Sequence, residues 1–310
     1  MAKVLAMFPG QGAQYVGMGR DVLSEFPLAK VVFEEAEDST RLNIRKLCLD
    51  GPEDELRLTA NTQPSILTLS VAVWRVLQGE TGLEPAAFAG HSLGEYSALV
   101  AAGKIGLGRA ALLVRRRGEA MQEAVPAGVG AMAAVMNVPA DDLRQRCTKI
   151  SEPGRVVEIA NYNSPQQLVV AGHKGAVEDL VQELEAAGQR SVMLPVSAPF
   201  HSTLMQPARE AMTPLLEDTA FVHNDARVIA NLTGKLEPDY GPAFLIQQIN
   251  SPVLWTQSME TAHQQLGCDT YVEMGPGKVL FGLARRILPK GPKLLHTEDL
   301  KQTIKDVQAL

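Results

Sequence analysis

The sequence predicts an α/β protein in which a small domain interrupts a larger one. An apolar run that ends in Gly90-His91-Ser92-Leu93-Gly94 and precedes an Ala- and Leu-rich run is typical of a strand, a sharp turn and a helix. Between residues 130 and 196 the patterns follow the order strand, helix, strand, strand, helix, strand, which is the order of a ferredoxin-like domain. We therefore expect a larger domain over 1–125 and 198–310 and a smaller domain over 126–197.

The first strand is expected over Lys3–Phe8, and a glycine-rich turn follows it at Pro9–Gln14. Such a turn can present a backbone N–H to an anion. An ordinary connection from a strand to a helix is the alternative. The turn gains a functional meaning only if its strand lies beside the strand of Ser92 in one parallel sheet.

The turn at Ser92 has the Gly-x-Ser-x-Gly pattern of a serine held between a strand and a helix. Gly90 and Gly94 lack a Cβ, so the turn can close and the helix can pack tightly against the strand. Ser92 is then exposed at the apex, and the backbone N–H of Leu93 lies at a helix N-terminus, where it can donate to a developing oxyanion. The alternative is a structural serine in a glycine-rich turn.

A polar residue, Gln63, lies at the expected start of a long helix. A surface helix is predicted over 53–60, and Asn61–Pro64 interrupts the pattern before an apolar helix over 65–77. Capping or turn chemistry is the simpler role for Gln63 on this pattern.

The helix expected over 108–124 carries a charged residue on its apolar side. A buried stripe runs along this helix at the spacing of Ala110, Leu113, Val114, Met121 and Ala124. Arg117 falls on the stripe, whereas Arg115 and Arg116 point elsewhere and are expected to be solvated. A buried guanidinium needs an anionic partner, and its fork of donors suits a carboxylate. That partner is either a substrate or an internal Asp or Glu, unless the side chain extends past the stripe to solvent.

The small domain is expected to hold four strands and two helices. The strands are predicted over Gly130–Val135, Val156–Ala160, Leu168–Ala171 and Ser191–Val196, and the helices over Ala140–Ile150 and Gly175–Ala187. Asn161–Pro165 is predicted to form the hairpin turn between the central strands. Ser197 begins the return to the larger domain, where further strands are expected over 228–231 and 270–274.

A serine hydroxyl is a weak nucleophile until a neighbouring base takes its proton, so a histidine is expected near Ser92. Of the six histidines, His201 has the most constrained setting, between Phe200 and Ser202. His91 adjoins Ser92, but neighbouring side chains at such a turn diverge, so His91 is a poor base. The remaining histidines are expected to be ordinary surface residues: His173, His223, His263 and His296.

The composition excludes several classes of protein. The formal net charge of −6 argues against a nucleic-acid-binding protein. No run approaches the ~18 apolar residues of a membrane span, and Val4–Phe8 is too short for the core of a signal peptide. The three cysteines are isolated and form no cluster at metal spacing, so neither a disulfide framework nor a metal site is expected. A cytoplasmic protein is the simplest interpretation.

Together these residues resemble the malonyl-CoA:acyl carrier protein transacylase family. The resemblance rests on stretches that span nearly the whole chain in the family's order: Pro9–Gly12, Thr62–Pro64, Gly90–Tyr96, Arg117-Gly118, Asn161–Pro165, Pro199–Ser202 and Glu273–Lys278. It implies an α/β-hydrolase-like large domain, an inserted ferredoxin-like small domain and an active site between them. It also implies malonyl-CoA as substrate, an acyl carrier protein bearing phosphopantetheine as partner, and a role in fatty acid biosynthesis. We further expect a monomer that needs no cofactor and binds neither nucleic acid nor membrane.

The resemblance also implies roles for individual residues. It makes Ser92 the acylated nucleophile, His201 the general base, Gln11 and Leu93 the donors of the oxyanion-hole N–H groups, and Arg117 the partner of the malonyl carboxylate. Gln63, Met121 and Phe200 are expected to form the substrate pocket. The family holds its histidine with a backbone carbonyl, and the matching position is assigned to Asn250.

Other functions stay open at this point. A serine thioesterase or hydrolase would share Ser92 and His201 but has no evident use for an arginine on a buried stripe. A non-catalytic scaffold that binds a carrier protein would leave the nucleophile turn unexplained, and an acyltransferase of a polyketide pathway is a rival within the enzymes. A basic cluster near the C-terminus is either a docking site for an acidic carrier or a solvated helix end: Arg285, Arg286, Lys290 and Lys293.

Overall fold

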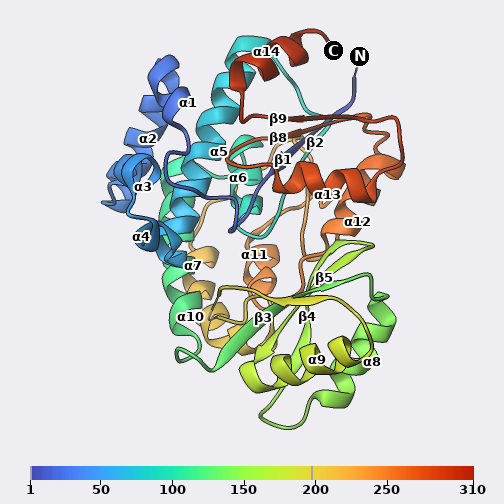
Figure 1. The fold of residues 1–310 in the computed structure, drawn as a ribbon. Helices are drawn as coiled ribbons and strands as arrows, with labels where there is room; N and C mark the ends of the chain where they lie inside the picture. The colour runs from blue at the N-terminus through green and yellow to red at the C-terminus, as the bar shows by residue number, and fades with distance from the viewer. Residues whose placement is uncertain (1, 197) are drawn as a thin grey trace.

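The computed structural model describes residues 2–196 and 198–310 and contains two β-sheets, one in each domain (Figure 1). Both chain termini lie at the end of the larger domain that faces away from the smaller one (Figure 1). The predicted domain boundary at Ser197 falls outside the described residues. Within the described ranges, no helix is both long and apolar enough to cross a membrane.

The large sheet is parallel and has the strand order β7-β2-β1-β8-β9. Its strands are β1 (Val4–Phe8), β2 (Ala87–Gly90), β7 (Val228–Ile229), β8 (Thr270–Glu273) and β9 (Lys293–His296). β1 pairs directly with β2, and Phe8 lies opposite Gly90. The two glycine-rich turns therefore follow neighbouring parallel strands, so residues 9–14 lie beside Ser92.

Helices cover both faces of the large sheet, which explains why the sequence of β1 is apolar throughout. Val4, Ala6 and Phe8 pack into one apolar cluster, whereas Leu5 and Met7 pack into another on the opposite face. A parallel strand buried on both faces needs such a continuous apolar run. The helices of this domain are α1 (Arg20–Glu25), α2 (Pro27–Thr40), α3 (Ile44–Asp50), α4 (Glu53–Arg57), α5 (Thr59–Thr81), α6 (Gly94–Ala101), α7 (Leu107–Glu123), α10 (Gln206–Glu217), α11 (Pro242–Gln248), α12 (Trp255–Glu260), α13 (Val279–Ile287) and α14 (Leu300–Gln308).

The start of α5 differs from the sequence-based expectation. The helix begins at Thr59 and continues through Pro64, so residues 61–64 do not interrupt it. A proline within a helix leaves the carbonyl four residues earlier without its usual donor. Here the guanidinium of Arg115 supplies that donor, because its Nη1 lies 3.0 Å from the carbonyl oxygen of Ala60. Arg115 is consequently half-buried rather than solvated as predicted.

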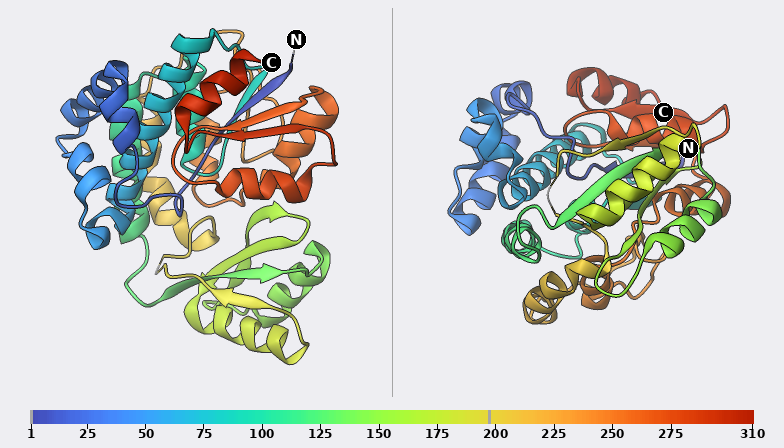
Figure 2. Two further views of the ribbon diagram at one scale, coloured as in Figure 1. Left: turned by 45° about the horizontal axis from the view of Figure 1, so that its top comes forward. Right: turned by 60° about the horizontal axis from the view of Figure 1, so that its bottom comes forward.

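The small sheet is antiparallel and has the order β4-β5-β3-β6, as expected for a ferredoxin-like domain (Figure 2). Its elements are β3 (Gly130–Met136), α8 (Ala140–Ile150), β4 (Val157–Ser164), β5 (Gln167–His173), α9 (Lys174–Ala186) and β6 (Ser191–Met193). The prediction of a hairpin turn over 161–165 is wrong by several residues. β4 stays paired with β5 as far as Ser164, which shortens the turn to residues 165 and 166.

The two domains share backbone hydrogen bonds in addition to the chain connections. The N–H of Val253 donates to the carbonyl of Ala160 at 2.9 Å, and the N–H of Tyr162 donates to the carbonyl of Val253 at 2.9 Å. Thr256 adds a side-chain bond to the carbonyl of Tyr162 at 3.0 Å. β4 therefore joins the small domain to the segment before α12, next to the cavity described below.

Candidate active site

The turn between β2 and α6 holds Ser92 in a conformation that few residues adopt. Its φ is 52°, in the left-handed region, and the polypeptide packs closely on both sides. A Cβ added to Gly90 would lie 1.9 Å from the carbonyl oxygen of Gly94, and one added to Gly94 would lie 2.1 Å from that of Phe8. Only glycine fits at these two positions, which is the physical reason for the Gly-x-Ser-x-Gly pattern.

Asn231, which follows the short strand β7, stabilises this turn through hydrogen bonds from its side chain. Its Oδ1 accepts from the backbone N–H of Ser92 at 2.6 Å, and its Nδ2 donates to the carbonyl of Gly90 at 2.6 Å. The Asn231 side chain thereby spans the apex of the turn. No role for Asn231 could be predicted from the sequence, because an isolated asparagine after a short strand carries no recognisable signal.

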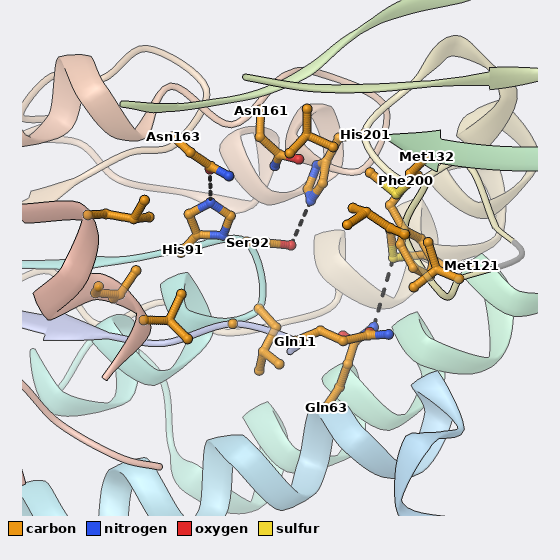
Figure 3. A pocket seen from close by; sticks show the side chains of 18 of the residues that line it. Gln11, Gln63, His91, Ser92, Met121, Met132, Asn161, Asn163, Phe200 and His201 are labelled. Atoms are coloured by element: carbon orange, nitrogen blue, oxygen red, sulfur yellow. Dashed lines mark hydrogen bonds between the residues drawn. The ribbon is translucent and has the colours of Figure 1, made fainter. Parts of the chain in front are cut away.

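Ser92 and His201 form a hydrogen-bonded pair in the structure (Figure 3). The Ser92 Oγ lies 2.6 Å from Nε2 of His201. Burial is the main cause that lowers the pKa of His201 to about 3, and the nearby Arg117 charge lowers it further. The imidazole is therefore neutral at physiological pH, with Nε2 available to accept the serine proton.

The other ring nitrogen of His201 is held by main-chain oxygens. Nδ1 lies 3.0 Å from the carbonyl oxygen of Gln248 and 3.2 Å from that of Ser251. The prediction that the main-chain carbonyl belongs to Asn250 is wrong, because the two acceptors belong to Gln248 and Ser251. The Asn250 side chain donates to Gln206 at 3.0 Å. A backbone acceptor can come from any residue type, so the sequence could place it only approximately.

Arg117 is buried with 1% of its surface exposed and lies beside the nucleophile. Its Nη1 donates to Gln63 at 2.8 Å, and its Nη2 donates to Ser92 Oγ at 3.1 Å and to Oε1 of Gln248 at 2.9 Å. Within 4.0 Å, no carboxylate of the described residues pairs with it, whereas its neighbours Arg115 and Arg116 both pair with Glu119. Burial lowers the pKa of Arg117. The alternative of an internal salt bridge is thus not seen in the structure.

Gln63 supports Arg117 instead of capping a helix. It lies in the interior of α5, with 1% of its surface exposed, and its Oε1 accepts from Arg117. Its Nε2 contacts Sδ of Met121 at 3.9 Å. The guanidinium is consequently held by two amide oxygens, one from Gln63 and one from Gln248.

The cavity in front of Ser92 lies between the domains and is lined by both (Figure 3). Phe200, Met121 and Met132 line one side of it, and Gln11 and Leu93 lie near Ser92. In the described part of the chain, no acceptor pairs with the backbone N–H of Gln11 or of Leu93. Both N–H groups are therefore available to an oxyanion formed at Ser92.

His91 points away from Ser92, in agreement with the expectation that it is a poor base. Its Nε2 lies 2.8 Å from Oδ1 of Asn163 on β4, so the side chain joins the nucleophile turn to the small domain (Figure 3). Burial lowers the pKa of His91.

Comparisons with known proteins show which proteins this chain resembles. The model of the acyl transferase domain family matches residues 6–288. The malonyl CoA-acyl carrier protein transacylase of Escherichia coli (strain K12) is 44% identical over 292 residues, which cover 93% of this chain and 94% of that relative.

Solved structures show the same architecture. FabD from Acinetobacter baumannii gives a TM-score of 0.95 at 38% identity and covers 100% of this chain and 99% of that one. A malonyl-transacylase solved in complex with a type II PKS acyl-carrier protein gives a TM-score of 0.92 at 39% identity and covers 98% of this chain and 100% of that one. The large α/β domain with its ferredoxin-like insertion is thus shared with these proteins.

Proposed function

Because this chain belongs to the acyl transferase family, we propose that it transfers a malonyl group from malonyl-CoA to the phosphopantetheine thiol of an acyl carrier protein. One observation supports malonyl as the acyl group. Arg117 is a fully buried cation without a carboxylate partner among the described residues, and its Nη2 lies 3.1 Å from the nucleophilic oxygen. A free carboxylate on the acyl group would supply the missing anion.

The first half-reaction forms an ester on Ser92. As Oγ attacks the thioester carbon, Nε2 of His201 takes the hydroxyl proton, and the carbonyls of Gln248 and Ser251 stabilise the resulting imidazolium through Nδ1. The carbonyl oxygen of the substrate becomes an oxyanion against the N–H groups of Gln11 and Leu93. Collapse of this intermediate expels CoA, which recovers a proton from His201, and leaves malonyl-Ser92.

The second half-reaction reverses these steps with a different thiol. The carrier thiol replaces CoA in the cavity, His201 takes its proton, and the thiolate attacks the ester carbon of malonyl-Ser92. The tetrahedral intermediate expels the Ser92 oxygen, which recovers the proton from His201. The kinetics are therefore expected to be ping-pong.

The test of this proposal is the covalent intermediate. Incubation with malonyl-CoA, followed by protein mass spectrometry and peptide mapping, should place a malonyl adduct on Ser92. Ser92→Ala should abolish the adduct without altering the circular dichroism spectrum, since a small, half-buried hydroxyl contributes little to packing. A malonyl adduct that maps to another residue in the wild-type protein would refute the assignment.

The same intermediate separates a transferase from a thioesterase or hydrolase. Isolated malonyl-enzyme should react faster with a carrier thiol than with water. A buried arginine that binds the acyl carboxylate retains the malonyl group on the enzyme instead of favouring its release by hydrolysis. Faster hydrolysis than transfer at physiological carrier concentrations would favour the hydrolase.

The biological setting and the state of the protein are further parts of the proposal. We infer a role in fatty acid biosynthesis, in the cytoplasm, by a monomer without a cofactor. A comparison of transfer rates to fatty acid and polyketide carrier proteins tests the setting, which matters because one structural relative was solved with a type II PKS carrier. Light scattering should give a mass near 33.4 kDa for a monomer.

A further inference from the structure

Glu95, in the first turn of α6, is a buried carboxylate that the proposed mechanism does not use. It has 1% of its surface exposed, and both of its oxygens accept hydrogen bonds. Oε1 accepts from the backbone N–H of Asn231 at 2.9 Å and from the hydroxyl of Tyr240 at 2.7 Å, and Oε2 accepts from Nε2 of Gln248. Burial raises the pKa of Glu95 to about 7, and these hydrogen bonds oppose that rise.

The amide of Gln248 lies between this carboxylate and the guanidinium of Arg117. Its Nε2 donates to Glu95 and also to the carbonyl of Ser92 at 2.9 Å, and its Oε1 accepts from Nη2 of Arg117 at 2.9 Å. An ionised carboxylate only accepts and a guanidinium only donates, so the two ends impose one orientation on the amide. With Nε2 directed at Glu95, Oε1 has to face Arg117.

We propose that Glu95 is a positioning residue that sets the acyl selectivity of the enzyme, an inference that rests on the proposed function. Glu95 fixes the orientation of Gln248, and Gln248 in turn holds Arg117 in the orientation that receives a carboxylate. Glu95 also binds the main chain of Asn231, whose side chain fastens the Ser92 turn. One carboxylate thereby aligns the nucleophile and the cation that selects the acyl group. Its negative charge also partly balances the buried charge of Arg117.

The replacement E95Q tests this alignment because it preserves the shape and removes one acceptor. If the new amide oxygen faces Asn231 and Tyr240, its NH₂ group faces Nε2 of Gln248, and two donors oppose each other. If the amide is reversed, its NH₂ group faces the N–H of Asn231 instead. Either Gln248 turns over, which directs its NH₂ group at Arg117, or the Ser92 turn is disturbed.

The measurement is the rate of Ser92 acylation by malonyl-CoA and by acetyl-CoA at pH 8, where the Glu95 carboxylate is ionised. We expect E95Q to lower the ratio of malonyl to acetyl acylation by about tenfold to a hundredfold, because a donor opposed to Arg117 disrupts the carboxylate site. A general loss of folding would lower both rates together and leave the ratio unchanged. A ratio within twofold of wild type in folded E95Q would overturn the inference.

Two further variants complete the test. Y240F removes a different donor to Glu95 and leaves Gln248 in place, so it should retain the wild-type ratio. Q248M removes the amide but keeps the main-chain carbonyl that holds His201, so it should lower the ratio as E95Q does. The double variant should show no further fall, because both changes break the same chain of contacts. Additive losses would show that Glu95 acts by another route, and Q248M carries the test alone if E95Q does not fold.

The inference and the proposed function fail in different ways. If wild-type protein does not prefer malonyl-CoA over acetyl-CoA, the proposed function is wrong. If the wild-type protein shows the preference and E95Q and Q248M retain it, only the role of Glu95 is wrong.

Discussion

Arg117→Ala is expected to remove the preference of the enzyme for malonyl-CoA while leaving the acylation chemistry in place. The guanidinium has no direct role in the proton transfer between Ser92 and His201, so the variant should still form an acyl-serine. Acetyl-CoA, which has no carboxylate to pair, should react at a rate equal to or above that of wild type. Malonyl-CoA should lose the interaction that distinguishes it.

The magnitude follows from the contacts of Arg117. Its two terminal nitrogens already donate to Gln63, Gln248 and Ser92 Oγ, while Nε has no partner among the described residues. A malonyl carboxylate therefore replaces the contact with Oγ and adds one charge-assisted bond, which contributes about 1.5–3 kcal/mol when both groups are desolvated. With acetyl bound, the buried cation contacts no carboxylate and is balanced only in part by the more distant Glu95, which adds a cost of similar size. The two contributions together are about 3–6 kcal/mol, so the malonyl preference should fall by about 10²–10⁴.

The assay is a competition. Wild-type protein and the variant are incubated with equimolar malonyl-CoA and acetyl-CoA, and the acyl groups on Ser92 and on the carrier are quantified by mass spectrometry. Arg117→Lys is the matched control: it keeps a positive charge but lacks the fork of donors, so its preference should lie between those of the other two proteins. If Arg117→Ala retains the wild-type preference, Arg117 does not bind the carboxylate and the choice of malonyl loses its main support.

Since burial lowers the pKa of His201 to about 3, kcat/KM for acylation by acetyl-CoA, which does not use the carboxylate site that Glu95 aligns, should stay flat from pH 8 to pH 5, whereas a base with the usual pKa of 6.5 would lose about thirtyfold at pH 5. Asn250→Ala should leave acylation within twofold of wild type, because main-chain oxygens hold the imidazole and the Asn250 side chain donates only to Gln206; a large loss would show that this side chain takes part in the site. Phe200→Ser should relax rejection of methylmalonyl-CoA, since a bulky ring at the cavity crowds an α-methyl branch; unchanged rejection in the competition assay would exclude this role. Charge reversal at Arg285 and Arg286, which are exposed at the end of α13, should raise the KM for an acidic carrier at low salt and leave the KM for malonyl-CoA unchanged. An unaltered carrier KM would count against docking at this end of α13.

The sequence by itself determined those features that depend on short stretches of chain. The strand, turn and helix around Ser92 lie within about 15 residues, and the glycines at 90 and 94 are required by close contacts that the pattern already implies. The position of Arg117 on an apolar stripe follows from helical spacing, because residues three and four apart share one face. The order of elements in the small domain was likewise visible in the alternation of apolar patterns.

Only the tertiary structure decided which polar groups meet around Ser92. Asn231 and Gln248 lie 139 and 156 positions further along the chain, yet both bind the Ser92 main chain. Neither follows a motif, and the histidine is held by carbonyl oxygens, which every residue possesses. The sequence therefore pointed to Asn250, two positions from one of the true acceptors and one from the other.

The helix α5 shows the same division. Asn61–Pro64 has the local signature of a break, and a proline there does remove a backbone donor. Arg115, which lies on another helix, supplies the replacement donor and allows α5 to continue. Gln63 is consequently buried in a continuous helix and faces Arg117 rather than capping a turn. Local patterns specify which conformations are favoured, whereas groups distant in sequence decide whether an unfavourable one is compensated.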